Sequence, residues 1–230
     1  MLPHEKEHER QAFKNMTPRK KLEHFLNYYL LQTVIVVAII GVALFMIWNA
    51  FIKKRDTIVF SAAVFDDIFD YEGLAAMTED LRKLYGVTDP HEIVRIDNSY
   101  RSRSTDDRLR LSVVTSAKEC DVIIADEPFF RELAGYGYFL DLSGVMTEDE
   151  AGAFSDRIVR APGRLESEEL IPSDGSGKGE TMSYGISLEN CEKWQSLKGT
   201  LEHPVAGIVA NTERVKPSLE FFSWLLDEKA

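Results

Sequence analysis

The strongest pattern in the sequence is an uncharged run over residues 25–52. Its densest part, Leu30 to Trp48, reads LLQTVIVVAIIGVALFMIW and contains no Asp, Glu, Lys or Arg. As a helix this part would rise about 1.5 Å per residue, roughly 30 Å in all, enough to cross the hydrocarbon of a bilayer. Tyr28, Tyr29 and Trp48 stand near its ends, where amphipathic rings favour the headgroup region. The pattern predicts a transmembrane helix over 25–52.

Two alternatives to a membrane helix are a buried core helix and a cleaved signal peptide. A core helix of this length would normally show a polar face, and only a few uncharged polar residues interrupt the run. A signal peptide has a shorter apolar region and a small-residue cleavage site, whereas bulky Trp48 stands just before Ala50. Both alternatives fit the pattern less well than a membrane helix.

Beyond the run, short apolar segments alternate with segments at helical spacing. Strands are predicted at residues 57–64, 91–97, 121–125, 182–188 and 204–210. Helices are predicted at about residues 74–86, 106–118, 126–137, 147–159 and 217–226. The segment 106–118 also alternates like a strand in part, and the order of elements favours a helix there. The alternation predicts an α/β domain with one mainly parallel, doubly wound sheet.

Charge separates the chain into a tail, the predicted span and one acidic domain. Six basic residues precede the span and three follow it immediately, which predicts a cytoplasmic tail over 1–24 and an extracytoplasmic domain over 56–230. That domain carries 18 of the 27 basic and 34 of the 38 acidic residues, a net charge of −16. The charge argues against nucleic acid or an anionic lipid surface as its partner.

The sequence contains few cysteines and histidines, the residues that most often bind metals or act in catalysis. Cys120 and Cys191 are too few for a disulfide framework, and the sequence leaves open whether they form one bridge or remain thiols. Residues 4–8, HEKEH, fit the H-E-x-x-H zinc pattern, but a short tail offers neither a third ligand nor a cleft. The scattered histidines form no Ser/His/Asp or Cys/His set that would indicate nucleophilic catalysis. We therefore expect no metal, no cofactor and no catalytic residues, and a protein that is not an enzyme.

Several segments together resemble the bacterial extracellular solute-binding proteins, the type II periplasmic-binding-protein fold. The similar segments are SVVTSAKECDV (112–122), PFFRELAGYGYFLDLSGVM (128–146), YGISL (184–188) and VAGIVANTERVKPSLEFFSWLL (205–226). The resemblance implies that 182–188 leaves the first lobe and that 204–210 returns to it. In that family a whole second lobe lies between these two strands, and ligand is clamped between the lobes. Here only fifteen residues, 189–203, lie between them. The resemblance therefore implies a single lobe that presents half a cleft.

In α/β sheets ligands bind beyond the carboxyl ends of the strands, so the loops there are the candidate site. The candidate ligand- or partner-facing residues are Phe65, Asp66, Asp67, Asn98, Ser99, Tyr100, Asp126, Glu127, Glu189 and Asn190. The alternative is that Asp126 caps a helix and the others are solvated turn residues. Exposed aromatic rings at Phe65, Phe69 or Tyr100 would indicate a protein partner.

Three functions follow as hypotheses. The first is a single-pass membrane protein that presents the lobe outside the cell as an accessory binding or interaction module of a membrane transport or envelope complex. The second is an ectodomain enzyme acting at the strand-end face. The third is a structural membrane protein completed by a partner. A small-molecule ligand is left open by the sequence.

Overall fold

A computed structural model describes residues 17–19, 30–49, 56–165 and 175–226 of the chain. The chain divides into two compact units, residues 1–55 and residues 56–230.

The first unit contains helix α3, Leu30–Ile47. It has 18 residues and no charged side chain, and the apolar side chains described along it are exposed, with Phe45 at 68%. Within the described ranges, no helix reaches the length and hydropathy that a membrane crossing requires. The described residues thus do not show the transmembrane helix predicted over 25–52. Residues 25–29 and 50–52, and most of the predicted tail, lie outside the described residues.

The second unit is an α/β domain, as the sequence predicts. Its strands are β1 (Thr57–Phe65), β2 (Glu92–Tyr100), β3 (Val122–Asp126), β4 (Ile158–Pro162), β5 (Thr181–Ser187) and β6 (Pro204–Ile208). Its α-helices are α4 (Tyr71–Leu84), α5 (Thr105–Ser116), α6 (Glu127–Gly135), α7 (Glu148–Ala153), α8 (Glu192–Gln195) and α9 (Val215–Leu226). Two short 3-10 helices, η2 (Leu142–Gly144) and η3 (Ser155–Arg157), complete the described elements of this unit.

The six strands form one sheet in the order β2-β1-β3-β6-β5-β4. β1 pairs in parallel with β2 and β3, with Ala62 opposite both Ile96 and Val122. The pairs β3–β6, β6–β5 and β5–β4 are antiparallel. The expectation of a mainly parallel sheet therefore holds for β2-β1-β3 and is wrong for the other half, because β5 and β6 are neighbours joined by a short connection rather than by a crossover.

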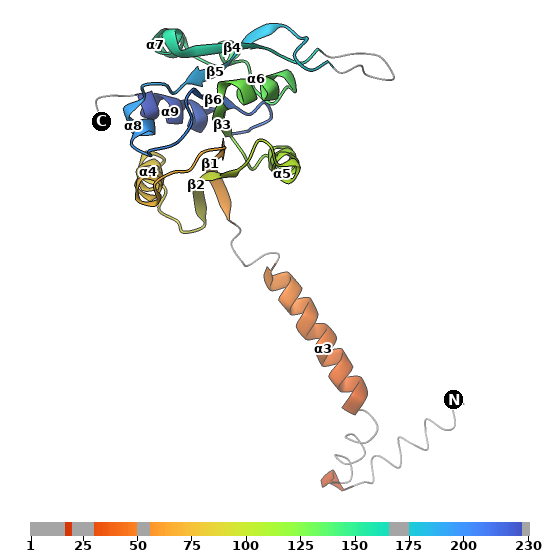
Figure 1. The fold of residues 1–230 in the computed structure, drawn as a ribbon. Coiled ribbons are helices and arrows are strands. Elements are labelled where there is room, and N and C mark those ends of the chain that lie inside the picture. Colours follow the sequence, from red (N-terminus) through yellow and green to blue (C-terminus); the bar gives the residue numbers. More distant parts are fainter. Residues whose placement is uncertain (1–16, 20–29, 50–55, 166–174, 227–230) are drawn as a thin grey trace. The chain divides into compact units, whose positions relative to one another are not determined.

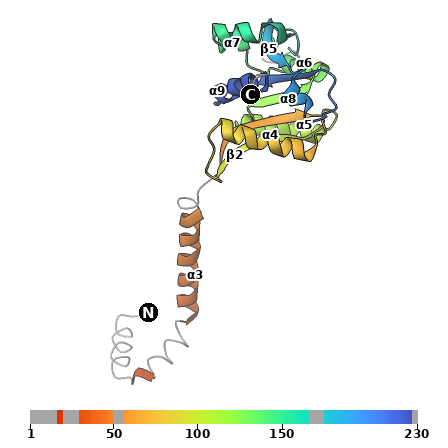
Figure 2. The same ribbon diagram turned by 90° about the vertical axis from the view of Figure 1, so that its left-hand side faces the viewer.

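Helices cover both faces of the sheet, so two cores form (Figure 1). One core packs Phe60 and Leu81 with Phe221, joining β1 to α4 and α9. The other packs Ile123 with Phe130 and so joins β3 to α6. Leu111 of α5 belongs to this second core as well. Figure 1 shows α4 and α5 on opposite sides of the strands, and Figure 2 turns α4, α8 and α9 toward the viewer. Successive side chains of β1 and β3 point to opposite faces, so both strands need continuous apolar sequence.

Two glycines on neighbouring strands make room for one aromatic ring. A Cβ at Gly185 in β5 would lie 2.5 Å from Cζ of Phe130, and a Cβ at Gly207 in β6 would lie 2.7 Å from its Cε2. Phe130 is fully buried and stacks on Phe139 with ring centroids 4.3 Å apart. The glycines let α6 pack directly against the antiparallel half of the sheet.

Several element boundaries differ from the prediction. Thr147 and Glu150 form a capping box at the start of the helix predicted over 147–159, but α7 ends at Ala153. The residues expected to continue that helix form η3 and then β4, an edge strand that ends in Pro162. A proline is tolerated at such an edge because β4 comes last in the strand order and pairs on one side only among the described strands. The short helix α8 within 189–203 was not predicted.

Candidate functional site

The candidate site is the edge of the sheet where β1, β3 and β5 end, and the connection 189–203 runs across it. Contacts from this connection to the residues after β1 and at the end of β3 hold it in place. A pocket of about 260 Å³ lies within the connection. Its lining residues are Leu188, Glu189, Asn190, Trp194, Gln195, Gly199, Leu201, Glu202, His203 and Pro204.

Asp67, directly after β1, holds the middle of the connection. Its side chain is fully buried. Its Oδ1 accepts hydrogen bonds from the backbone N–H of Thr200, from the Thr200 hydroxyl at 3.1 Å and from the N–H of Ile68 at 2.9 Å. Its Oδ2 has no hydrogen-bond partner among the described residues and faces Gly199. A carboxylate that accepts from the chain itself in this way is a structural clamp rather than a free ligand-binding group.

Asp126, at the end of β3, holds the end of the connection just before β6. Its Oδ1 accepts from the N–H of His203 at 2.9 Å, and the N–H of Glu127 donates to the carbonyl of His203 at 3.0 Å. His203 Nδ1 also lies 2.5 Å from Oε1 of Glu189. The hydrogen bond and charge of Glu189 raise the pKa of His203 above its ordinary value. The expected helix cap is absent: the Asp126 side chain makes no capping bond to α6.

The remaining predicted residues lie elsewhere or face inward. Asn98, Ser99 and Tyr100 belong to β2 and not to a loop, so their predicted placement is wrong. The Ser99 hydroxyl accepts from Arg110, and Tyr100 lies under the Arg110 guanidinium at 4.3 Å. These contacts attach the end of β2 to α5, because the strand continues until Tyr100 pairs with Phe65.

Two predicted residues turn the chain. Asp66 and Asn190 both adopt a φ of 56°, in the left-handed region that Asp and Asn tolerate better than most side chains. Asp66 accepts from the N–H of Ser102 at 3.1 Å. Glu127 forms an ion pair with Arg131 one turn along α6. Asp66, Asn190 and Glu127 therefore fit the alternative to a binding site, in which the candidate residues only form turns and helix starts in contact with solvent.

The exposed aromatic rings that would indicate a protein partner are not found at the three positions named for them. Phe65, Phe69 and Tyr100 are all buried, because each packs against rings or helices of the two cores. Two residues that the sequence did not single out, Ile68 at 65% and Tyr71 at 84%, are exposed directly after β1. Ile68 stands directly before buried Phe69, and Tyr71 is the first residue of α4, so no periodic pattern in the sequence marked either side chain as exposed.

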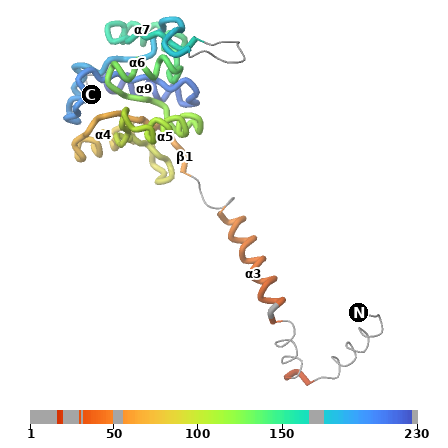
Figure 3. Tube along the Cα trace, turned by 45° about the vertical axis from the view of Figure 1, so that its right-hand side comes forward, coloured from red at the N-terminus to blue at the C-terminus, as the bar shows by residue number. Residues whose placement is uncertain are grey.

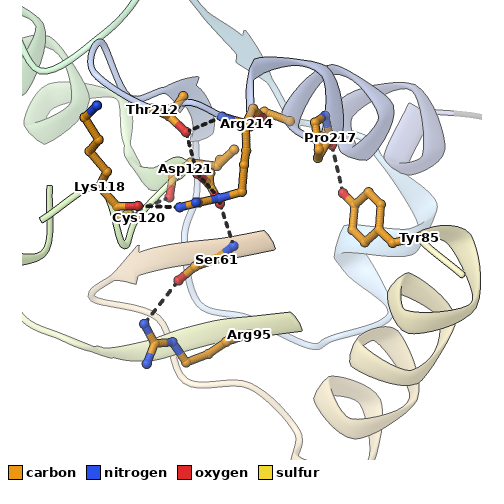
Figure 4. A network of polar contacts seen from close by, with 11 residues as sticks. Ser61, Tyr85, Arg95, Lys118, Cys120, Asp121, Thr212, Arg214 and Pro217 are labelled. Atoms are coloured by element: carbon orange, nitrogen blue, oxygen red, sulfur yellow. Dashed lines mark hydrogen bonds and ion pairs between the residues drawn. The ribbon is translucent and has the colours of Figure 1, made fainter. Parts of the chain in front are cut away.

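A second polar cluster lies at the opposite end of β3 and is structural (Figure 4). Fully buried Asp121 accepts from the Ser61 N–H at 2.9 Å, from the Thr212 hydroxyl and from Nε of Arg214 at 3.0 Å. Arg214 comes from the loop before α9, so the ion pair fixes that loop to the start of β3. Figure 4 shows the Arg214 side chain reaching across this junction. A buried carboxylate with this many donors is fully satisfied.

The described residues include no group of three or more His, Cys, Asp or Glu side chains that could hold a metal ion. Cys120 and Cys191 are both buried free thiols in different cores, which settles the pairing that the sequence left open. Burial raises the pKa of the Cys120 thiol to about 12. Neither cysteine lines the strand-end pocket.

Comparison with protein-family models, with curated proteins and with solved structures returns no match for this chain.

Proposed function

We propose that this chain is a single-pass membrane protein whose α/β lobe, similar to one lobe of a solute-binding protein, lies outside the cell. There it serves as a protein-interaction module, an accessory subunit of a membrane transport or envelope complex.

Support for the anchor comes from the first unit of the chain. Helix α3 is uncharged along its 18 residues and its described apolar side chains are exposed. The 18 described residues rise only about 27 Å, a little less than the hydrocarbon thickness. The uncharged sequence extends beyond them on both sides, to residues 25 and 52. Since exposed apolar helices are costly in water, a lipid environment accounts for this composition best.

The interaction proposal depends on one observation: the carboxylates at the strand ends bind the chain itself. Asp67 and Asp126, the groups that would face a ligand, instead accept backbone amides of the connection 189–203. β5 and β6 are antiparallel neighbours, in keeping with strands that leave and re-enter one lobe. A short connection clamped onto the edge leaves no room for a closing second lobe, so a small solute would bury little of its surface there.

The same edge offers a surface for a protein. Ile68 and Tyr71 are exposed beside the clamp, and a large apolar and a large aromatic side chain are typical anchors of protein interfaces. A partner that covers them would bury the edge without needing access to Asp67. This surface is called the Ile68–Tyr71 edge below.

Alkaline extraction of membranes tests the anchor in the full chain. The double substitution Val37→Lys and Ile40→Lys places two charges in α3, and each costs about 2.5–3.5 kcal/mol at the centre of a membrane helix. We expect the wild type and a Val37→Leu, Ile40→Leu control to stay in the membrane pellet and the lysine variant to be released. Release of the wild type by alkaline extraction would refute the anchor.

Site-specific photocrosslinking in native membranes tests the interaction surface. A photoreactive amino acid at Tyr71 is compared with one at Lys216 on α9, whose side chain is 88% exposed. We expect a discrete protein adduct from position 71 that is absent from position 216, and loss of the adduct when Ile68→Asp is added. The same adduct pattern from both positions, or none from position 71, would contradict an interaction through this edge.

A further inference from the structure

A second pocket lies away from the strand-end edge and is larger than the pocket there. It has a volume of about 600 Å³ and lies between α5, the C-terminal end of α6 and the residues that follow β6. The traces in Figures 1 and 3 show α5 and α6 on the same side of the domain. None of the predicted strand-end residues lines this pocket. Its volume is in the range of pockets that hold small organic molecules.

The charge of this pocket is opposite to that of the domain around it. Its described lining contains two arginines, Arg108 and Arg164, and no Asp or Glu, in a domain of net charge −16. The Arg108 guanidinium is already paired, because it binds both carboxylate oxygens of Glu132 at 2.5 and 3.3 Å. The Arg164 guanidinium makes no ion pair among the described residues. Within this part of the chain, the pocket thus carries one positive charge that is left without a counter-charge.

Hydroxyl groups stand on the wall of the same pocket. Ser112 and Ser116 lie one turn apart on α5, both exposed, and both line it. Thr115 between them is not free, because its hydroxyl donates to the carbonyl of Leu111 at 2.8 Å. The spacing i, i+4 places the two serine side chains on one helix face. They can donate hydrogen bonds to an anion that forms an ion pair with Arg164.

The floor of the pocket is apolar. Leu111, Leu133 and Val209 line it and are nearly fully buried in the domain core. Gly137 turns the chain at a φ of 81°, and a Cβ there would lie 3.6 Å from Cβ of Arg164. A side chain at position 137 would be strained because of this positive φ, while its contact with Arg164 would be of ordinary van der Waals length. An apolar floor with polar groups on one wall is the usual composition of a small-molecule site.

We propose that this pocket binds a small organic anion: a carboxylate or phosphate monoester carried on a compact apolar body. The anionic group pairs with Arg164 and accepts from Ser112 and Ser116, and the apolar body packs on Leu133. This goes beyond the interaction role proposed above, because the pocket shares no residue with the Ile68–Tyr71 edge. Failure of one proposal leaves the other standing.

Calorimetric titration of the full-length protein in lipid nanodiscs tests the site, with empty nanodiscs as the blank. The probes are phenyl phosphate and phenylacetate, with benzyl alcohol as the neutral analogue. The variant Arg164→Gln removes the charge. Arg160→Gln is the matched control, since Arg160 on β4 loses the same charge but does not line the pocket. Ser116→Leu fills the pocket from its wall and provides an independent variant, and unchanged thermal unfolding shows that each variant folds.

We expect at least one of the two anions to bind in the millimolar range or more tightly, with one site per chain, and the stronger of them identifies the anionic group. Arg164→Gln should weaken that binding about tenfold, as should Ser116→Leu, and Arg160→Gln should leave it unchanged. Benzyl alcohol should bind at least about tenfold more weakly than the anion. Equal binding of the neutral analogue, an unaffected Arg164→Gln variant, or no binding of either anion would each overturn the proposal.

Discussion

The clamp between Asp67 and the connection 189–203 can be tested by adding one methyl group at Gly199. A Cβ at Gly199 would lie 2.8 Å from Oδ1 and 2.9 Å from Cγ of Asp67, and closer still to Oδ2. Contacts this short do not occur in real structures, so the connection or the carboxylate must move. Overpacking of this kind costs about 1–3 kcal/mol, and we expect Gly199→Ala to lower the free energy of unfolding by about 2 kcal/mol.

The second arm of the test removes the carboxylate. Asp67→Ala deletes three accepted hydrogen bonds in a fully buried position. With about 1 kcal/mol for each bond, the expected loss is about 3 kcal/mol. In the double variant the methyl group added at position 199 meets no carboxylate, so its cost should vanish. The double variant should then be about as stable as Asp67→Ala, with a coupling energy of about 2 kcal/mol.

Urea unfolding of residues 56–230, followed by circular dichroism, measures these free energies. Gly152→Ala is the matched control, because a Cβ at Gly152 in α7 meets nothing within 4 Å. This control should be neutral or stabilising by up to about 1 kcal/mol, as expected for alanine in a helix. Additive losses in the double variant, or a Gly199→Ala variant as stable as the control, would refute the reasoning.

Three further predictions concern other polar groups. Asp121→Ala should lower the free energy of unfolding by about 3–5 kcal/mol in the same urea assay, because it leaves Arg214 without its counter-charge and the buried Ser61 amide without its acceptor. Glu189 raises the pKa of His203, so the ion pair stabilises the fold fully below the ordinary pKa of 6.5 and stops doing so as the pH rises through the raised pKa. The free energy of unfolding should therefore fall across this pH window in the wild type, and this pH dependence should be absent in His203→Gln. Because burial raises the pKa of Cys120 to about 12, this thiol should resist iodoacetamide at pH 8 in the folded protein and react after unfolding, as mass spectrometry would show.

The sequence predicted the elements whose local pattern agrees with their final environment. β1 and β3 are continuous apolar runs because both of their faces are buried, and their prediction is confirmed. The start of the helix predicted over 147–159 is confirmed, because Thr147 and Glu150, three positions apart, form a capping box there. β4 was missed because an edge strand of five residues that ends in Pro162 has little strand pattern of its own.

The candidate site could be placed from the sequence but its chemistry could not. Asp67 and Asp126 were singled out because they follow apolar strands, and both lie at the strand ends. Their partners, Thr200 and His203, are 133 and 77 positions away. Hydrogen bonds over such separations depend on the path of the connection, which no local pattern specifies. For the same reason the sequence placed Phe65 and Tyr100 among the candidate ligand- or partner-facing residues, although these two rings pack on each other at 5.1 Å.

Hydrogen–deuterium exchange of the full chain tests most directly whether the strand-end edge is closed by its own connection. The amides of Thr200 and His203 donate to Asp67 and Asp126 in the structure. They should exchange as slowly as the amides of β3, because both require local opening before exchange. Exchange of these two amides at the rate of an unstructured peptide would mean that the connection is open, and would contradict the closed edge on which the proposed interaction role depends.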